Sequence, residues 1–296
     1  MNKQEIENYK KAGEILAKVR EYSKKIIQPG ELLLNIAKKI ENKILELGGE
    51  IAFPVNLSIN EVAAHYHPTL EDKTIAQGLL KVDLGIHING YIADSAFSLD
   101  LSKDKKYTKL IQASKEALDN ALELLNKNPT LNEIGSIIEE TIKKCGFSSI
   151  RNLSGHGLSK YDLHSGIVIP NYPNKNSKKL LEGAYAIEPF STTGKGEVYE
   201  GNPSNIYVLI KKKNIRNLTS KKILNYIIEK HKTLPFSLRE IQEKFGKMAR
   251  FCLKDLEKNE IVYSFPQLIE KSHKPVAQSE HTFIKLSNKK IIITTK

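Results

Sequence analysis

The sequence predicts an α+β fold that is internally duplicated and carries a helical insertion. Two helical patterns followed by extended segments occur twice, in the same order, along the 296-residue chain. An Asn-Gly pair between alternating apolar residues marks a tight hairpin in the first half. Residues 211–279 have three further helical patterns and a different charge balance. A chain of this length can hold a full-sized core together with such an insertion.

The first half begins with two helical patterns. Apolar residues at helical spacing predict a helix over Gln4–Ile27, which ends near Pro29-Gly30. A second helix follows, with Gly48-Gly49 as its stop and one apolar face formed by Leu33, Ile36, Ile40, Ile44 and Leu47. Extended segments are then predicted over Ile51–Ser58 and Leu79–Leu101.

The same order returns in the second half. Helices are predicted from about Lys106 to Leu125 and from Asn132 to Lys144. Short matches repeat as well: Pro29 has a counterpart in Pro129, and Asn56-Leu57-Ser58 recurs as Asn152-Leu153-Ser154, an offset of 96. Each match alone could arise by chance, but their shared order favours an internal duplication.

The insertion has its own pattern. Helices are predicted over Ser220–His231, Ser237–Phe245 and Lys247–Glu257, followed by a small hairpin around Pro266. Three helices and a hairpin suggest a winged-helix-like module. We therefore expect a catalytic body formed by residues 1–210 and 280–296, and an insertion over residues 211–279.

The basic charge is concentrated in this insertion. The chain has 46 Lys and Arg against 34 Asp and Glu, a net charge of +12, and residues 211–279 account for +9 of it. Such an excess would suit a nucleic-acid or membrane-surface partner. Only five of the cations are arginines, which disfavours reading of base edges. A general bias towards Lys, Asn and Ile explains the charge equally well.

Cysteine content and the distribution of apolar residues indicate where in the cell the protein works. Cys145 and Cys252 cannot form a disulfide framework, and they lack the spacing of a zinc or redox motif. Charged residues are distributed from Lys3 to Lys25, so the first 25 residues do not contain the apolar core of a signal peptide. No apolar run approaches the roughly 18 to 20 residues that span a membrane. We expect a soluble cytoplasmic protein.

The predicted hairpin carries two acids. With Asn89-Gly90 as a two-residue loop, Ile88 pairs with Tyr91 and Gly85 pairs with Asp94. Asp83 then emerges on the same face as Asp94, roughly 7–8 Å away at Cα. Two acids within strands of Val, Leu and Ile would be costly without a counter-charge, whereas on a solvated face they would need none. The apolar setting favours a shared metal centre.

Four more residues have unusual surroundings. His156 is flanked by glycines, His164 lies in Leu163-His164-Ser165, Glu188 lies in an apolar strand, and Glu280 opens the last strand region. Singly, each is more often structural than catalytic. Together, the carboxylates of Asp83, Asp94, Glu188 and Glu280 with the imidazole of His156 would suit two divalent ions such as Mn, Fe or Co.

This set, in this order, resembles the pita-bread metallopeptidases of the creatinase/aminopeptidase fold, family M24, and most closely the type II methionine aminopeptidases in their archaeal form. The similar blocks are Phe53–Asn60 with His65, Val82–Asp94, Leu153–Gly157, Ile187–Phe190 and Glu280–Thr282. The resemblance runs essentially from end to end. The early position of Asp83 and the helical insertion between Glu188 and Glu280 separate the chain from prolidases. The absence of a long basic amino-terminal extension favours the archaeal type.

The resemblance implies a function and roles for these residues. A dinuclear methionyl aminopeptidase would remove the N-terminal methionine of nascent proteins when the second residue is small. Its two divalent ions (Co, Mn, Fe(II) or Zn) would be held by Asp83, Asp94, His156, Glu188 and Glu280. Glu188 would also be the general base, His164 would polarise the scissile carbonyl, and His65 would bind the substrate backbone. The methionine pocket would be lined in part by Phe53, Pro54 and Asn56.

Two readings from other classes stay open. A non-catalytic relative that binds RNA or ribosomes should have lost ligands, and none is missing here. A DNA-binding stripe at helical spacing consists of Lys247, Arg250, Lys254 and Lys258, although the nearby acids Asp255 and Glu257 favour an ordinary solvated face. We expect a monomer whose basic insertion makes transient contact with ribosomal RNA and which has no membrane partner.

Overall fold

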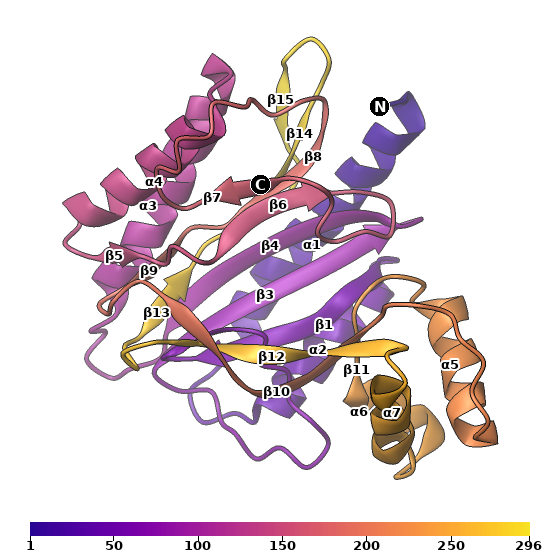
Figure 1. Ribbon diagram of the computed structural model, residues 1–296. Helices are drawn as coiled ribbons and strands as arrows, with labels where there is room; N and C mark the ends of the chain where they lie inside the picture. Colours follow the sequence, from indigo (N-terminus) through magenta and orange to yellow (C-terminus); the bar gives the residue numbers. More distant parts are fainter.

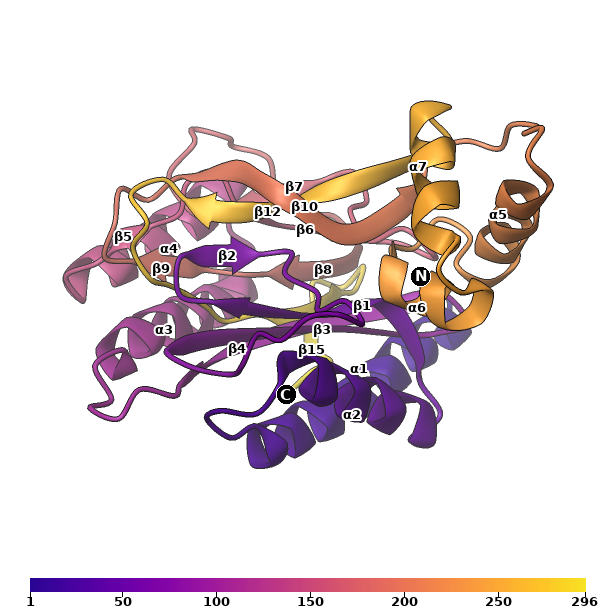
Figure 2. The same cartoon turned by 90° about the horizontal axis from the view of Figure 1, so that it is seen from below.

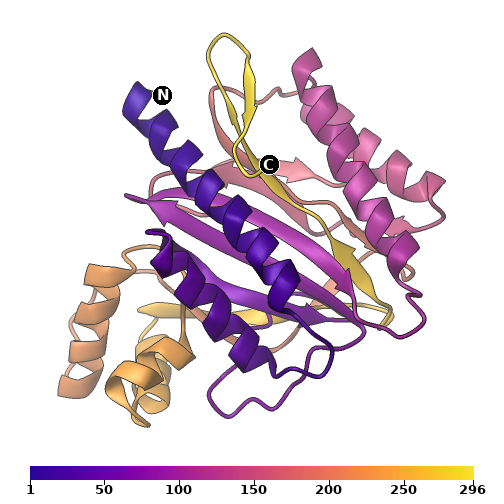
Figure 3. The ribbon, with the colours of Figure 1, turned by 180° about the vertical axis from the view of Figure 1, so that it is seen from behind.

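The computed structural model describes residues 1–296, and its first half is two helices on one sheet (Figure 1). The sheet has the order β1-β3-β4, formed by β1 (Glu50–Ile59), β3 (Leu79–Ile88) and β4 (Tyr91–Asp100). Helices α1 (Lys3–Ile26) and α2 (Leu33–Glu46) lie across one face of it (Figure 3). Because side chains alternate along a strand, Val82, Leu84 and Ile86 of β3 are buried beneath these helices. The opposite face of β3 and β4 is therefore free to build a site.

The second half repeats this plan. Helices α3 (Thr108–Leu124) and α4 (Leu131–Lys144) are joined by the 3₁₀ turn η1 (Leu125–Lys127). They share an apolar core with a five-stranded sheet of order β15-β14-β8-β6-β7. Its strands are β6 (Ser154–Leu158), β7 (Val168–Pro170), β8 (Gly183–Ile187), β14 (His281–Lys285) and β15 (Ile291–Ile293). Pro29 and Pro129 each precede the second helix of their half, so the expected duplication of helix pairs on sheets is confirmed.

The two halves are joined through their inner strands. The Asp94 N–H donates to the Thr282 hydroxyl at 2.8 Å, and that hydroxyl donates to the Asp94 carbonyl at 2.8 Å. A small sheet of order β13-β9-β5 lies nearby, formed by β5 (Ser148–Ser149), β9 (Phe190–Thr192) and β13 (Val276–Gln278). The acid-bearing hairpin of the first half therefore lies directly against β14 of the second.

A fourth sheet covers the inner faces. Its order is β11-β10-β12-β2, formed by β2 (Val62–Ala64), β10 (Val198–Leu209), β11 (Phe236–Ser237) and β12 (Val262–Glu270). Strands β10 and β12 lie on the side of the first sheet opposite α1 and α2 (Figure 2). Helices α5 (Leu218–Lys230), α6 (Leu238–Phe245) and α7 (Ala249–Lys258) group at one end of this pair, where they share an apolar core with Tyr207, Leu209 and Val262.

The three helices of the insertion lie where the sequence predicts them, but the predicted hairpin around Pro266 is wrong. Residues 262–270 form one continuous strand that pairs with β10. Pro266 lies opposite Pro203, and the register of the two strands is irregular on both sides of this pair. Since proline has no N–H to donate, the two facing prolines interrupt the hydrogen bonds between β10 and β12 at this pair. The pairing resumes on both sides, so β12 remains one strand. None of the helices combines the length and the hydrophobicity that a membrane span requires.

Candidate metal centre and active site

The hairpin brings Asp83 and Asp94 to one face in the predicted register. Ile88 pairs with Tyr91, Gly85 pairs with Asp94, and Asp83 lies opposite Ala96. The side chain of Asp94 is buried, and one carboxylate oxygen of each acid is buried with no hydrogen-bond partner. Buried polar atoms without a partner are rare in proteins, and they mark a place where a further group is needed.

A β-bulge in β1 sets the wall beside these acids. Phe53 pairs with Gly85 and Asn56 with Asp83, so two residues of β1 lie between these pairs where β3 has only Leu84. In a regular strand, residues three apart point to opposite faces, and the bulge brings both Phe53 and Asn56 to the cavity. Gly85 is required there, since a Cβ would overlap the Phe53 ring.

Pro54 is the one predicted site residue that does not line the cavity. It falls within the bulge and is buried, and its carbonyl accepts a hydrogen bond of 2.9 Å from the Asn56 side chain. Pro54 therefore orients Asn56 instead of forming the pocket surface.

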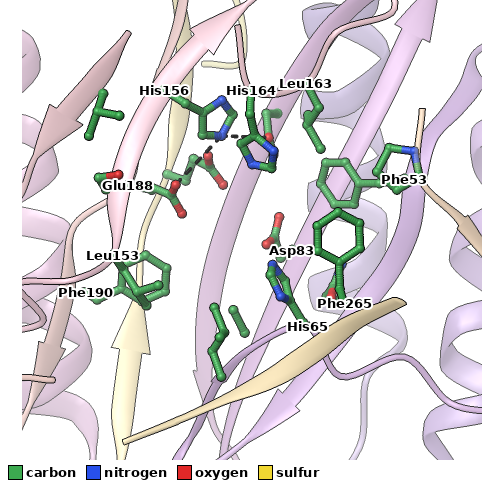
Figure 4. Close-up of a pocket in the computed structure, with 18 of the residues that line it drawn as sticks. Phe53, His65, Asp83, Leu153, His156, Leu163, His164, Glu188, Phe190 and Phe265 are labelled. Atoms are coloured by element: carbon green, nitrogen blue, oxygen red, sulfur yellow. Dashed lines mark ion pairs between the residues drawn. The ribbon is translucent and has the colours of Figure 1, made fainter. Parts of the chain in front are cut away.

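The second half supplies three more groups. His156 lies on β6, Glu188 follows β8, and Glu280 directly precedes β14. Because His281 pairs with Ile187, the same register brings Glu280 opposite Glu188. The Nε2 atom of His156 lies 3.7 Å from Oδ2 of Asp94 and 3.8 Å from Oε1 of Glu188 (Figure 4). Candidate ligand atoms of Asp94, His156 and Glu280 all lie within 4.8 Å of one another.

The charges of this cluster are uncompensated within the protein. Burial raises the pKa of Asp83 to about 7. Burial and the charges of neighbouring carboxylates raise the pKa of Asp94, Glu188 and Glu280 well above the usual range. Burial also lowers the pKa of His156 to about 3, so its imidazole is neutral and can act as a ligand. Four carboxylates, two of which have an oxygen without a hydrogen-bond partner, and one neutral imidazole fit hard to borderline divalent cations.

Two further histidines face the same space. The His164 ring lies 4.5 Å from the His156 ring, measured between centroids, and it is open to the cavity (Figure 4). His65 has a left-handed backbone with φ of 64°, and its Nδ1 lies 3.1 Å from the carbonyl oxygen of Pro266. Burial lowers the pKa of His65 to about 4, which keeps this ring neutral at pH 7.

All these groups line one cavity of about 310 Å³. It contains nine of the ten predicted site residues, namely Phe53, Asn56, His65, Asp83, Asp94, His156, His164, Glu188 and Glu280. The other walls are largely apolar and come from several elements, including Leu153, Leu163, Phe190, Ile206, Pro235, Phe265 and Leu268. A deep polar end and an apolar side are thus combined in one pocket (Figure 4).

Gln278 belongs to the site but was not predicted from the sequence. Its Nε2 donates to Oε2 of Glu188 at 3.4 Å, and its side chain also counteracts the rise in the pKa of Asp83. A signal was present, because Gln278 lies two residues before Glu280 and strand side chains alternate. Thr282, which holds the Asp94 backbone, follows Glu280 by the same interval. The apolar wall residues of β10 and β12 gave no such signal.

Comparisons with known proteins identify the family. Residues 7–215 match the model of metallopeptidase family M24. The methionine aminopeptidase of Pyrococcus abyssi is 41% identical over 99% of this chain and 100% of its own length. The enzyme of Methanocaldococcus jannaschii is 42% identical over the same shares, and that of Saccharolobus solfataricus is 38% identical over 100% of this chain and 99% of its own length.

Solved structures agree on the fold. A thermophilic Arx1 superimposes with a TM-score of 0.85 at 18% identity, covering 99% of this chain and 91% of that chain. A methionine aminopeptidase from Thermotoga maritima gives 0.70 at 21% identity, covering 100% and 98%. A prolidase from Pyrococcus furiosus gives 0.63 at 21% identity, covering 100% and 64%. The pita-bread fold and the resemblance to type II methionine aminopeptidases are therefore confirmed. The chain belongs to metallopeptidase family M24 and, within it, to the same group as the archaeal methionine aminopeptidases.

Proposed function

We propose that this cavity releases the N-terminal methionine of polypeptides whose second residue is small, and that two divalent metal ions are its cofactors. The ligands would be Asp83, Asp94, His156, Glu188 and Glu280. The observation that carries the proposal is the convergence of these side chains, from both halves, on one cavity with two unpartnered carboxylate oxygens. When bound, such ions lower the pKa of water and polarise a peptide carbonyl. The donor set suits Co, Mn, Fe(II) or Zn without distinguishing among them.

Glu188 is our candidate for the general base. Gln278 donates to one of its oxygens at 3.4 Å, so the carboxylate is oriented within the cavity. The side chain is only partly buried, which leaves it within reach of a water molecule and a substrate. In this role, Glu188 takes a proton from the attacking water and delivers it to the leaving amine.

The two cavity histidines would bind the peptide itself. Nδ1 of His65 must carry its proton, because its partner is the carbonyl of Pro266, which can only accept. Nε2 of the neutral ring is then an acceptor, suited to an N–H of the substrate backbone. His164 lies beside His156 and can donate an N–H to the scissile carbonyl, where negative charge develops during attack.

The apolar side of the cavity would take the methionine side chain. Phe53 and Leu163 provide an apolar wall, and Asn56 adds one amide at its edge. An unbranched thioether fills such an irregular slot well. Selectivity for a small second residue would follow from crowding at the exit of the slot, where a larger side chain would clash.

Peptide cleavage by the metal-reconstituted protein tests this function. Three substrate series, starting with Met-Ala, Met-Lys and Xaa-Pro, are incubated with protein loaded with each of the four metals. We expect methionine release from the Met-Ala series and little from the Met-Lys series. Cleavage of Xaa-Pro substrates would favour a prolidase-like activity, and no cleavage with any metal would favour a binding protein.

We further propose that residues 211–279 form a separate winged-helix-like insertion on a catalytic body of residues 1–210 and 280–296. Support comes from its three helices, which form one apolar core with each other, with the adjoining end of β10 and with the start of β12. We propose that a monomer works in the cytoplasm and touches ribosomal RNA through this insertion. Its exposed cations are Lys247, just before α7, and Arg250, Lys254 and Lys258 on α7.

Salt-dependent cosedimentation with ribosomes tests that contact. Replacing the three lysines of the stripe with glutamine should weaken cosedimentation and leave peptide cleavage within about twofold, since rim charges act mainly on association. Unchanged cosedimentation would remove the ribosomal proposal and leave the peptidase proposal intact.

A further inference from the structure

The connector between α5 and α6, residues 231–237, lies against the loop that carries His164. Leu234 of the connector is buried in the same apolar cluster as Leu163 and Phe53. The next residue, Pro235, lines the cavity. The insertion therefore supplies part of the cavity wall and contacts residues 159–166 directly.

Tyr161 of that loop contacts both the β3–β4 hairpin and the connector. Its N–H donates to the Gly90 carbonyl at 2.8 Å, and its ring lies 5.5 Å from the His87 ring, edge to face. The Lys232 ammonium lies 3.6 Å from the centre of the Tyr161 ring. The hydroxyl of Thr233 donates to the Tyr161 carbonyl. Tyr161 is thus held by the β3–β4 hairpin on one side and by the connector on the other.

The backbone around Tyr161 is tightly constrained. Tyr161 has a φ of 58°, in the left-handed region that non-glycine residues rarely adopt. Ser159 and Asp162 exchange backbone hydrogen bonds of 2.9 and 3.1 Å across it, which closes a tight turn. A Cβ at Gly90 would overlap the Tyr161 ring, so the packing there leaves no spare room. A shift of Tyr161 must therefore move the residues that follow the turn, Leu163 and His164.

We infer that Tyr161 is a positioning residue that fixes His164, and that the α5–α6 connector holds it in place. The inference rests on the proposed role of His164 at the scissile carbonyl. A helical insertion far along the chain thereby sets the geometry of the reaction, although it provides none of the proposed ligands. Misplacement of a donor by about 1 Å can cost up to about 100-fold in rate, so a loosened loop should lower kcat.

A double-mutant cycle of Tyr161→Ala with His164→Ala tests this. We expect Tyr161→Ala to lower kcat about tenfold in the natural background and less than about twofold when His164 is already alanine. KM for a Met-Ala peptide should rise as well, by a similar factor in both backgrounds, because Leu163 of the same turn lines the methionine slot. Tyr161→Phe should keep full activity, since the hydroxyl of Tyr161 has no hydrogen bond and the ring contacts remain.

The outcomes separate the two claims. Equal losses of kcat in both backgrounds would overturn the positioning role and leave the proposed function standing. A silent His164→Ala would overturn the role of His164 and with it this inference. Tyr22→Ala is the matched control, because Tyr22 also carries a lysine ammonium over its ring, that of Lys43 at 5.4 Å, and it does not line the cavity.

A second measurement covers the case in which Tyr161→Ala does not fold. Thr233→Val removes only the hydroxyl that bonds the Tyr161 carbonyl, at an exposed position. Hydrogen exchange of the metal-loaded enzyme should become about two- to threefold faster in residues 159–166 and stay unchanged in residues 60–66. Unchanged exchange in both segments would show that the connector does not hold the loop.

Discussion

The centre between the two halves and the helical insertion use charge in opposite ways. The centre brings four carboxylates into the interior with no lysine or arginine to neutralise them, and desolvation raises the pKa of each one. The insertion carries a net charge of +9, mostly on exposed lysines. Uncompensated buried charge is costly, whereas exposed charge costs little. The contrast indicates that the reaction chemistry is concentrated in the centre and that the net charge of the chain says little about it.

Asp94→Asn should have the largest effect, because it removes a proposed ligand and leaves the fold intact. We expect kcat/KM for a Met-Ala peptide to fall at least about 10³-fold, beyond the 10- to 100-fold typical of losing an outer partner of a ligand. Steady-state kinetics with metal analysis measures it. Asp100→Asn is the control, because Asp100 ends the same strand and binds the turn at Ser102. Equal losses in both variants would contradict a special role for Asp94.

Arg239→Met should cause the next largest change, in stability. Arg239 of α6 is buried and pairs with Glu41 of α2 at 2.5 Å, so its removal leaves an unpaired buried carboxylate. Breaking such a pair should lower the free energy of unfolding by about 3–5 kcal/mol. Urea unfolding measures this change.

Lys38→Met is the matched control. Lys38 pairs with Glu243 at 2.8 Å, and this ion pair joins the same two helices on the surface. Its loss should cost less than about 1 kcal/mol. Similar costs for the two variants would mean that the buried pair is not what anchors the insertion to the body.

His67 lies beside the same ion pair and predicts a pH dependence. Burial and the nearby Arg239 charge lower the pKa of His67 to about 3. The hydrogen bond to the Val55 carbonyl and the charge of Glu240 partly offset this decrease. Above pH 6.5 the ring is neutral in both folded and unfolded chains. As the pH falls below that value, only the unfolded chain binds the proton, so stability falls by up to about 1.4 kcal/mol per pH unit.

Comparison with His67→Gln isolates this contribution. Burial raises the pKa of Glu41 and gives a contribution of the opposite sign, but it is common to both proteins. Unfolding free energies measured from pH 7 to pH 4 should therefore fall more steeply for the natural chain. Parallel curves would contradict a buried neutral His67.

Gly85→Ala should have the smallest effect, on substrate binding. The added Cβ overlaps the Phe53 ring and displaces it into the cavity. We expect KM for a Met-Ala peptide to rise about tenfold, as overpacking shifts a pocket wall. Adding Phe53→Leu should restore part of the loss by making room. An unchanged KM for Gly85→Ala would mean that the bulge does not shape the methionine slot.

Local patterns were enough to predict several of these features. The Asn89-Gly90 turn sets the hairpin register, which brings Asp83 and Asp94 to one face as predicted. The stripe of Ile36, Ile40 and Ile44 predicts a buried helix face, and all three are fully buried. In each case the decisive contacts lie within one hairpin or one helix.

Features that depend on distant contacts were not predictable. The β1 bulge accompanies the packing of the Phe53 ring over Gly85, which belongs to another strand. Residues 262–270 form one strand because they pair with β10 on both sides of Pro266, which lies opposite Pro203, 63 residues earlier. The contact of Tyr161 with Lys232 joins segments that no local pattern relates. Sequence periodicity reports which face of an element is buried, and it does not report what packs against that face.

Metal titration of the stripped protein tests the central claim most directly. The chain is freed of metal, and methionine release from a Met-Ala peptide is followed as Mn²⁺, Co²⁺, Fe²⁺ or Zn²⁺ is added under anaerobic conditions. We predict no release without metal and activity that saturates at two bound ions per chain. Release by the stripped protein, or no release with any of the four metals, would contradict the proposal that these carboxylates and His156 form a metallopeptidase centre.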